Sequence, residues 1–346
     1  KAWATLIPGL VQASMQRSDA GAEALYLLSQ IDMEVGSRED AINDLALVLR
    51  RYPNKASGSD VPERFWRLYS DYISDLADAE RWFDIAALHE SVWSPTVRRA
   101  VRAPEALVHV ARAYEEVGLP VPASRVLGDA VQVLTDRGLD DPRLVFHLAE
   151  LYIQTGEGVA RLPEPAATPH DPDFVAEEEE APSVFGSAND RVWQAALDTL
   201  DYLREKPHDE IPNARIDLLE ARAHVGREDL TAAAESLRRA SRDPEYRDVA
   251  SLRLALLDAS AGRCDRAVPA LQRLAVTGAA QPLMEDSRPW LALARCYIAD
   301  NRVAAAADAA RTAARLAGEQ LERLAEAESP KAGEATPTPA STVADA

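Results

Sequence analysis

The stretch AEALYLLSQIDMEVGSREDAINDLALVLRRYPNK, residues 22–55, decides the fold. Apolar side chains recur in its first half at the spacing of one helix face, and they are Leu25, Leu28, Ile31 and Val35. Gly36 favours an end to this helix, because glycine adopts the left-handed conformation of a helix C-terminus without a Cβ clash. The second half repeats the helical spacing up to Pro53 with Ala41, Leu45, Val48 and Leu49. The segment therefore predicts a hairpin of two antiparallel helices.

Turn residues of the same kind recur along the chain and set a register: Gly36, Gly118, Gly156, Gly226, Gly262 and Asn301. Asparagine is the common substitute for glycine in the left-handed conformation. Apolar residues stand eight positions before each of them: Leu28, Val110, Leu148, Leu218, Leu254 and Leu293. Alanine stands five positions after four of them: Ala41, Ala123, Ala267 and Ala306. This self-similarity predicts a repeat protein.

The repeat resembles the tetratricopeptide repeat family, whose 34-residue unit carries the pattern W-x2-L-G-x2-Y…A-x3-F…P. The last unit matches it with Trp290, Leu293, Ala294, Tyr297, Ala306 and Ala310. The resemblance covers most of residues 20–318, with longer spacing between turns than in the family. It implies an all-α fold, a right-handed α-solenoid of antiparallel helix hairpins. The first helix of each hairpin would then line a concave groove that binds peptides.

The organisation along the chain follows from this register. Residues 1–18 form a leading helix that resembles half of a truncated repeat, and residues 19–156 form the first hairpins. Residues 157–188 are acidic and rich in proline, which predicts a disordered insertion between two helices of one hairpin. Residues 189–328 continue with further hairpins and a capping helix, and residues 329–346 form a disordered tail. The expected hairpins are 19–53, 61–94, 104–136, 142–206, 212–242, 248–276 and 287–318.

Composition supports a helical protein and excludes some partners. The chain has 346 residues, of which 47% are apolar and only 6% aromatic, and few residues favour strands. It carries 57 acidic and 38 basic side chains, a formal charge of -19. This excess argues against nucleic acid and anionic lipid as partners. No run of 18 apolar residues occurs, so we expect no insertion into a membrane.

Two features bear on the context of the protein. Cys264 and Cys296 are too few for a disulfide framework in a chain of this length, and we expect two small buried side chains on helices. The chain begins with Lys1, as a processed form or a fragment would. The sequence therefore leaves the compartment of this soluble protein open between cytoplasm and periplasm.

Catalytic signatures are absent from the sequence. It contains no G-x-S-x-G, no H-E-x-x-H, no G-x-x-x-x-G-K-[ST] and no cluster of Cys and His. His109, His147 and His224 fall on first helices of three expected hairpins. Packed helices lie about 9–10 Å apart, too far for these side chains to share a metal ion. We therefore expect no enzyme, no cofactor and no metal site.

The resemblance maps a candidate peptide-binding groove onto inward positions of the first helices: His109, Arg112, Arg143, Phe146, His147, Arg253, Arg288 and Arg295. Most of these residues are basic in a strongly acidic protein. Because guanidinium pairs in a bidentate manner with carboxylates, an acidic peptide is one candidate ligand. The alternative is that the arginine side chains pair locally with Glu116, Glu150, Asp258 and Asp265.

Aromatic residues crowd the second expected hairpin. Trp66, Tyr69 and Ile73 share one helical face, which indicates core packing, with an exposed anchor for a partner as the alternative. The sequence as a whole predicts a non-catalytic scaffold that binds a protein or peptide segment in a concave groove. A structural subunit of a larger complex, or the repeat region of a longer protein with its activity upstream, is the alternative.

Overall fold

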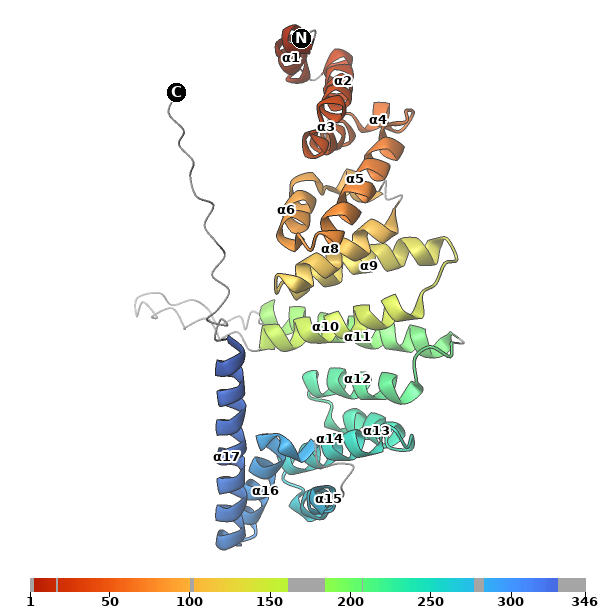
Figure 1. Cartoon of the computed structure of the whole chain (residues 1–346). Helices are drawn as coiled ribbons and strands as arrows, with labels where there is room; N and C mark the ends of the chain where they lie inside the picture. The colour runs from red at the N-terminus through yellow and green to blue at the C-terminus, as the bar shows by residue number, and fades with distance from the viewer. Residues whose placement is uncertain are drawn as a thin grey trace, which may run out of the picture. The chain divides into compact units, whose positions relative to one another are not determined.

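The computed structural model describes residues 3–16, 18–99, 103–160, 184–206, 208–276 and 283–328. Throughout these ranges the regular secondary structure is helical, and they contain no strand (Figure 1). The chain divides into two compact units, Lys1–Asp229 and Leu230–Ala346. Consecutive helices pack against each other within each unit, so the expected all-α solenoid of helix hairpins is confirmed.

Unit 1, Lys1–Asp229, begins with α1 (Trp3–Ser14), which packs on α2 (Asp19–Val35). The other helices of this unit are α3 (Arg38–Arg51), α4 (Pro53–Ala56), α5 (Val61–Asp78), α6 (Trp82–Val92), α7 (Pro95–Arg99), α8 (Pro104–Glu116), α9 (Pro120–Asp136), α10 (Pro142–Ala160), α11 (Val184–Glu205) and α12 (Asn213–Gly226). Hairpins pair α2 with α3, α5 with α6, α8 with α9, and α10 with α11. First helices also touch across repeats, as α5 does with α8 and α10 with α12.

The core of the second hairpin is aromatic. Trp66, Tyr69 and Ile73 are fully buried, which confirms the core interpretation of this helical face. Trp66 and Tyr69 meet edge to face, a favourable arrangement for two rings. Phe83, on the second helix α6, is not part of this core, because 75% of its surface is exposed. Helix α6 contributes mainly aliphatic side chains to this core, among them Ile85, Leu88 and Val92.

Four of the six expected turn residues adopt the left-handed conformation: Gly36, Gly118, Gly262 and Asn301. The second hairpin turns at Glu80, whose φ is 54°. The turn assignments of Gly156 and Gly226 were wrong. Gly156 lies inside α10 and Gly226 is the last residue of α12.

Gly156 and Gly226 instead make room for an indole. A Cβ added at Gly156 would lie 2.6 Å from the ring of Trp193, and one added at Gly226 would lie 2.3 Å from it. Trp193, on α11, is buried between α10 and α12. The absence of a side chain at both glycines thus lets three helices close on one large ring, a packing role that sequence register alone does not distinguish from a turn.

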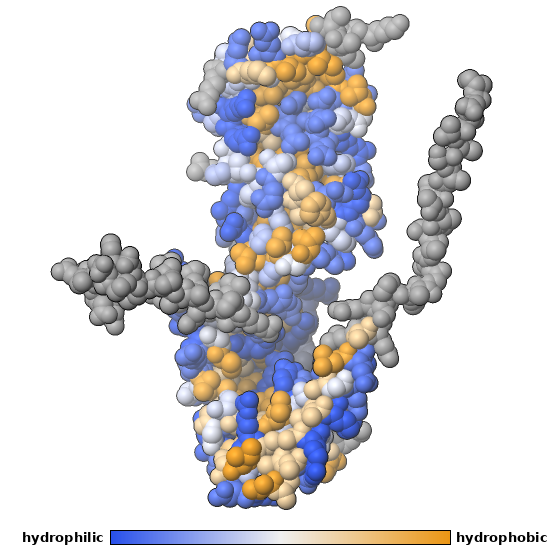
Figure 2. Space-filling model, turned by 90° about the vertical axis from the view of Figure 1, so that its left-hand side faces the viewer, coloured by the Kyte–Doolittle hydropathy of each residue, from blue (hydrophilic) through white to orange (hydrophobic). Residues whose placement is uncertain are grey.

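Unit 2, Leu230–Ala346, contains α13 (Leu230–Ala240), α14 (Arg247–Ser260), α15 (Cys264–Val276), α16 (Ser287–Ala299) and α17 (Val303–Glu328). Hairpins pair α14 with α15 and α16 with α17. The expected hairpin 212–242 would join α12 of unit 1 to α13 of unit 2, and it stays a prediction. Figure 2 shows the alanine-rich surface of α17 in pale orange.

Cys264 and Cys296 form a disulfide between the start of α15 and α16, so the expectation of two unlinked buried cysteines was wrong. Their Cα atoms lie 5.3 Å apart, within the range that a disulfide bridges. The two residues belong to different hairpins and are 32 positions apart in sequence. In a chain with only two cysteines, a separation of this size does not indicate from the sequence alone that the two are bonded.

Several expected boundaries fall beside or outside the described residues. Helix α10 runs to Ala160 and α11 begins at Val184, while residues 161–183, most of the expected insertion, lie outside the described part of the chain. The expected tail, 329–346, also lies outside it. Helix α17 ends at Glu328, and its Leu321 is 67% exposed.

Candidate functional site

Two of the residues mapped onto the groove line one cavity in unit 1. Arg112 of α8 and His147 of α10 border a cavity of about 320 Å³. Its other lining residues are Val108, Ala111, Glu115, Glu116 and Leu127. Helices α8 and α10 are the first helices of consecutive hairpins. The structure therefore brings these two positions together from neighbouring repeats.

His147 ties the two first helices to each other. Its Nε2 lies 2.9 Å from Oε1 of Glu115 on α8, and its Nδ1 lies 3.5 Å from Oε2 of Glu150 on α10. Hydrogen bonds to Glu115 and then to Glu150 raise the pKa of His147 to about 9. The imidazole is therefore a cation at neutral pH, and its charge is shared between two carboxylates.

The same polar chain continues to α12. Arg215 donates a hydrogen bond of 3.2 Å from Nη2 to Oε1 of Glu150, and its guanidinium lies 4.4 Å from the ring centroid of Phe146. The hydrogen bond from His147, with Arg215 as a further cation, holds the pKa of Glu150 below its usual value. Phe146, expected in the groove, is itself buried. Its ring packs against the guanidinium of Arg215 rather than facing solvent.

The other mapped residues of unit 1 have varied surroundings. Arg143 lies 2.9 Å from a carboxylate oxygen of Glu210. Arg112 approaches Glu116 at 3.7 Å and lies 4.9 Å from the ring centroid of Trp82. His109 is half-buried on α8. Local pairing, the alternative interpretation of the basic residues, thus holds for Arg112 with Glu116, whereas Arg143 pairs with Glu210, which is distant in sequence and was not among the expected partners.

Unit 2 carries the remaining three mapped residues. Arg253 is half-buried on α14, and Arg295 is exposed on α16. Arg288 pairs with Asp286, the residue that caps α16, and this hydrogen bond lowers the pKa of Asp286. The eight residues therefore divide into five in unit 1 and three in unit 2, and a groove that joins all of them stays a prediction.

Sequence reasoning missed a row of cavities between α2 and α5. One, of about 500 Å³, is lined by Tyr26 and by the apolar residues Ala22, Leu27, Val48, Ala56 and Val61, among others. Two more, of about 380 and 420 Å³, share Met33, Leu68 and Asp71. The sequence does contain a feature that indicates an exposed apolar surface here. Leu27 and Met33 lie outside the buried stripe of the first helix and are each 45% exposed.

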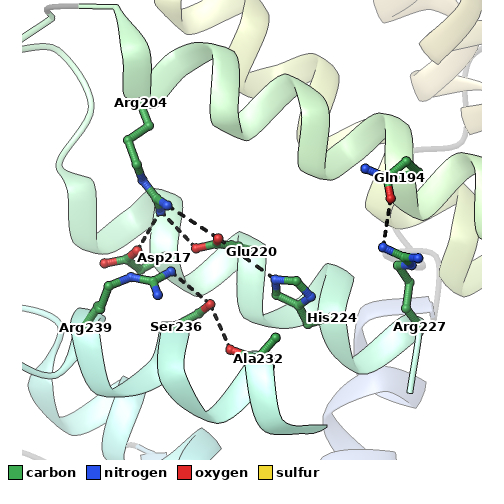
Figure 3. Close-up of polar contacts among 9 residues, drawn as sticks. All are labelled: Gln194, Arg204, Asp217, Glu220, His224, Arg227, Ala232, Ser236 and Arg239. Carbon is green, nitrogen blue, oxygen red and sulfur yellow. Dashed lines mark hydrogen bonds and ion pairs between the residues drawn. The ribbon is translucent and has the colours of Figure 1, made fainter. Parts of the chain in front are cut away.

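A second polar network joins α11 to α12 (Figure 3). Arg204 of α11 donates from Nη2 to Oδ1 of Asp217 at 2.8 Å and to Oε2 of Glu220 at 2.9 Å. His224 lies 4.0 Å from Glu220, one helical turn further along α12. Both carboxylates are largely buried. One guanidinium that holds two carboxylates fixes the two helices in register, which is a structural role.

Among the described residues, no three His, Cys, Asp or Glu side chains are grouped so that they could hold a metal ion. Likewise, no helix in the described ranges combines the length and apolarity required to cross a bilayer. The networks can position helices and present charge, and the cavities beside them can accept side chains.

Comparison with protein families identifies the repeat. Residues 183–315, from the start of α11 into α17, match the family model described as a tetratricopeptide repeat-like domain. This part of the chain is a tetratricopeptide repeat-like domain, and the resemblance stated from the sequence is confirmed. None of the curated proteins compared with the chain matches it. Membership indicates a protein-interaction role in general terms, and such domains are typically non-catalytic.

Proposed function

We propose that this protein is a non-catalytic scaffold that binds a peptide or protein segment along the first helices of its repeats. The cavity between α8 and α10 carries the proposal, because Arg112 and His147 line it from consecutive hairpins. Stacked repeats present long surfaces suited to extended or helical segments. The general role of tetratricopeptide repeat-like domains supports the same function.

An acidic segment is the ligand that the mapped basic residues favour. Arg295 is exposed, and Arg112 pairs with Glu116 only at 3.7 Å. A ligand carboxylate that approaches Arg112 would compete with Glu116. Exposed ion pairs are worth about 0–1 kcal/mol, so such an exchange costs little.

Affinity capture with the intact chain tests this proposal. The variant Arg112→Glu, Arg253→Glu, Arg295→Glu should lose the proteins that the wild-type chain retains, with a melting temperature unchanged within a few degrees. Arg311→Glu, Arg315→Glu, Arg323→Glu, at three exposed positions of α17, is the matched control with the same change in net charge and should retain them. Equal recovery with both variants would exclude these arginines from partner binding.

An assembly subunit is the second candidate function, and one observation favours it. Apolar side chains at both ends of the described chain are exposed, among them Leu6 and Val11 on α1, Met15 just after α1, and Leu321 on α17. Figure 2 shows apolar patches among hydrophilic residues on the side it displays. Light scattering separates the two functions, because a scaffold is monomeric alone whereas an assembly subunit forms a stable oligomer.

A further inference from the structure

Three cavities follow one another between α2 and α5 and together make up a furrow, bordered by Leu27 and Met33 on α2 and by Val61 and Leu68 on α5. Both helices are first helices of their hairpins and belong to unit 1. The larger cavity lies at the Ala22 end, and the two smaller ones lie toward Asp75. None of the eight residues mapped from the sequence lines this furrow.

A polar bridge separates the larger, mainly apolar cavity, which Asp60 lines, from the two smaller cavities, one of which Arg64 lines. Tyr26 donates from its hydroxyl to the carboxylate of Asp60 at 3.3 Å, and Arg64 donates from Nε to Oδ2 of Asp60 at 2.6 Å. The guanidinium of Arg64 also lies 5.2 Å from the ring centroid of Tyr26. These contacts keep the bridge in place. A ligand would therefore bury side chains on both sides of it.

Exposed apolar side chains mark the cavities on both sides of the bridge. Leu27 borders the pocket on one side of the bridge and Met33 the pockets on the other, and each is 45% exposed. They stand six positions apart on α2, which corresponds to a rise of about 9 Å along the helix axis at about 1.5 Å per residue. An extended segment in the polyproline II conformation has three residues per turn and rises about 3.1 Å per residue, so side chains three positions apart lie about 9 Å apart on the same side. Two apolar side chains at positions i and i+3 of an extended segment match this spacing.

The charge along the furrow is acidic. Asp60 and Asp75 are neutralised by Arg64 and Arg38. Glu23, Glu34 and Asp71 also border the furrow and are exposed, and within the described residues no ion pair engages them. Arg67 is the single cation on this rim without such a pair in the described ranges. Three carboxylates against one guanidinium favour a cationic partner.

We infer that the furrow between α2 and α5 binds an extended, basic segment of a partner protein with two large apolar side chains three positions apart. The inference rests on the proposed scaffold function and names the chemistry of one partner. The apolar side chains fill the pockets on either side of the Tyr26–Asp60–Arg64 bridge. Lysine or arginine residues between and beside them face Glu23, Glu34 and Asp71.

Fluorescence anisotropy with a synthetic probe tests the inference. The probe is a labelled peptide of lysine and glycine with two leucines three positions apart. Control peptides carry alanine in place of leucine or glutamate in place of lysine. The intact chain should bind the probe, and each control peptide at least about tenfold more weakly, because the alanine peptide buries less apolar surface and the glutamate peptide is repelled by the acidic rim.

Variants of the chain locate the binding site. Leu27→Lys with Met33→Lys should weaken probe binding at least about tenfold, whereas Phe83→Lys, at an exposed apolar residue of α6, should leave it unchanged. Glu23→Gln, Glu34→Gln, Asp71→Asn should weaken binding at low salt and remove most of its salt dependence. The matched control is Asp78→Asn, Glu205→Gln, Asp209→Asn, which changes the net charge equally at other exposed positions.

The outcomes separate this inference from the scaffold function. Two results would overturn the furrow assignment and leave the scaffold function standing. One is probe binding that is unchanged by the Leu27 and Met33 substitutions. The other is a chain that does not bind the probe but still captures partner proteins. Preference for the glutamate peptide overturns the basic chemistry. If neither probe nor partner proteins bind, both proposals fail.

Discussion

The imidazole of His147 lies 2.9 Å from the carboxylate of Glu115, and this contact joins the first helices of two consecutive repeats. Tetratricopeptide-like hairpins bury their apolar faces on their neighbours. A charged contact between first helices adds a contribution to the free energy of unfolding that depends on pH. It also lies on the wall of the cavity that the proposed function uses.

The contact predicts a pH-dependent stability difference. Because the pKa of His147 is raised to about 9 in the folded chain, its stabilisation is full below about pH 6.5 and is lost as the pH rises through about 9. Wild type should therefore melt a few degrees above His147→Gln at pH 6. The two should converge above pH 10. A difference that is the same at both pH values would show that the ion pair contributes nothing.

Asp44 predicts the opposite dependence. Burial, with Asp32 and Asp40 nearby, raises the pKa of Asp44 to about 7. A carboxyl whose folded pKa is raised destabilises the fold increasingly as the pH rises from about 4 to about 7. Asp44→Asn should therefore raise the melting temperature by a few degrees at pH 8 and change it little at pH 4. Asp78→Asn, at an exposed position, should have no effect at either pH.

The glycines around Trp193 provide a matched test of helix packing. A Cβ at Gly156 would lie 2.6 Å from the indole, whereas one at Gly158, two residues further along α10, meets nothing within 4 Å. Gly156→Ala should destabilise the chain by about 1–3 kcal/mol through overpacking. Gly158→Ala should stabilise it by about 0.5–1 kcal/mol, since alanine favours a helix. Denaturant unfolding measures both, and equal effects would contradict the packing of Trp193 on Gly156.

The disulfide predicts a redox-dependent stability of unit 2. Peptide mapping without reductant should recover Cys264 linked to Cys296. Because the bridge closes a loop of 32 residues, Cys264→Ser with Cys296→Ser should cost about 3–4 kcal/mol. Reductant should lower the melting temperature of wild type and leave the double variant unchanged. Two free thiols in the purified, unreduced chain would refute the bridge.

Much of the fold followed from the sequence because hairpins are local structures. Helical spacing and left-handed turns at Gly36, Gly118, Gly262 and Asn301 were read correctly. The same rule failed at Gly156, since a glycine that accommodates a ring looks like a glycine that ends a helix, and at Gly226 it missed the left-handed residue, Glu228, by two positions. The disulfide was missed because contact between Cys264 and Cys296 depends on the packing of two hairpins.

The candidate site was less predictable than the fold. Register places Arg112 and His147 on first helices, and the structure brings them to one cavity. Register does not reveal which carboxylates reach them, such as Glu115 from the preceding repeat. It also missed the furrow beside Leu27 and Met33, because cavities depend on how neighbouring helices diverge.

Site-specific photo-crosslinking tests the central claim, partner binding along the first helices, most directly. A photoreactive residue is placed at Leu27, Arg67 or His109 on first helices, and at Phe83 or Gln132 on second helices, in the intact chain. The account predicts crosslinks to the same partner proteins from first-helix positions and few from second-helix positions. Crosslinks mainly from Phe83 and Gln132, or equally from both sets, would contradict it.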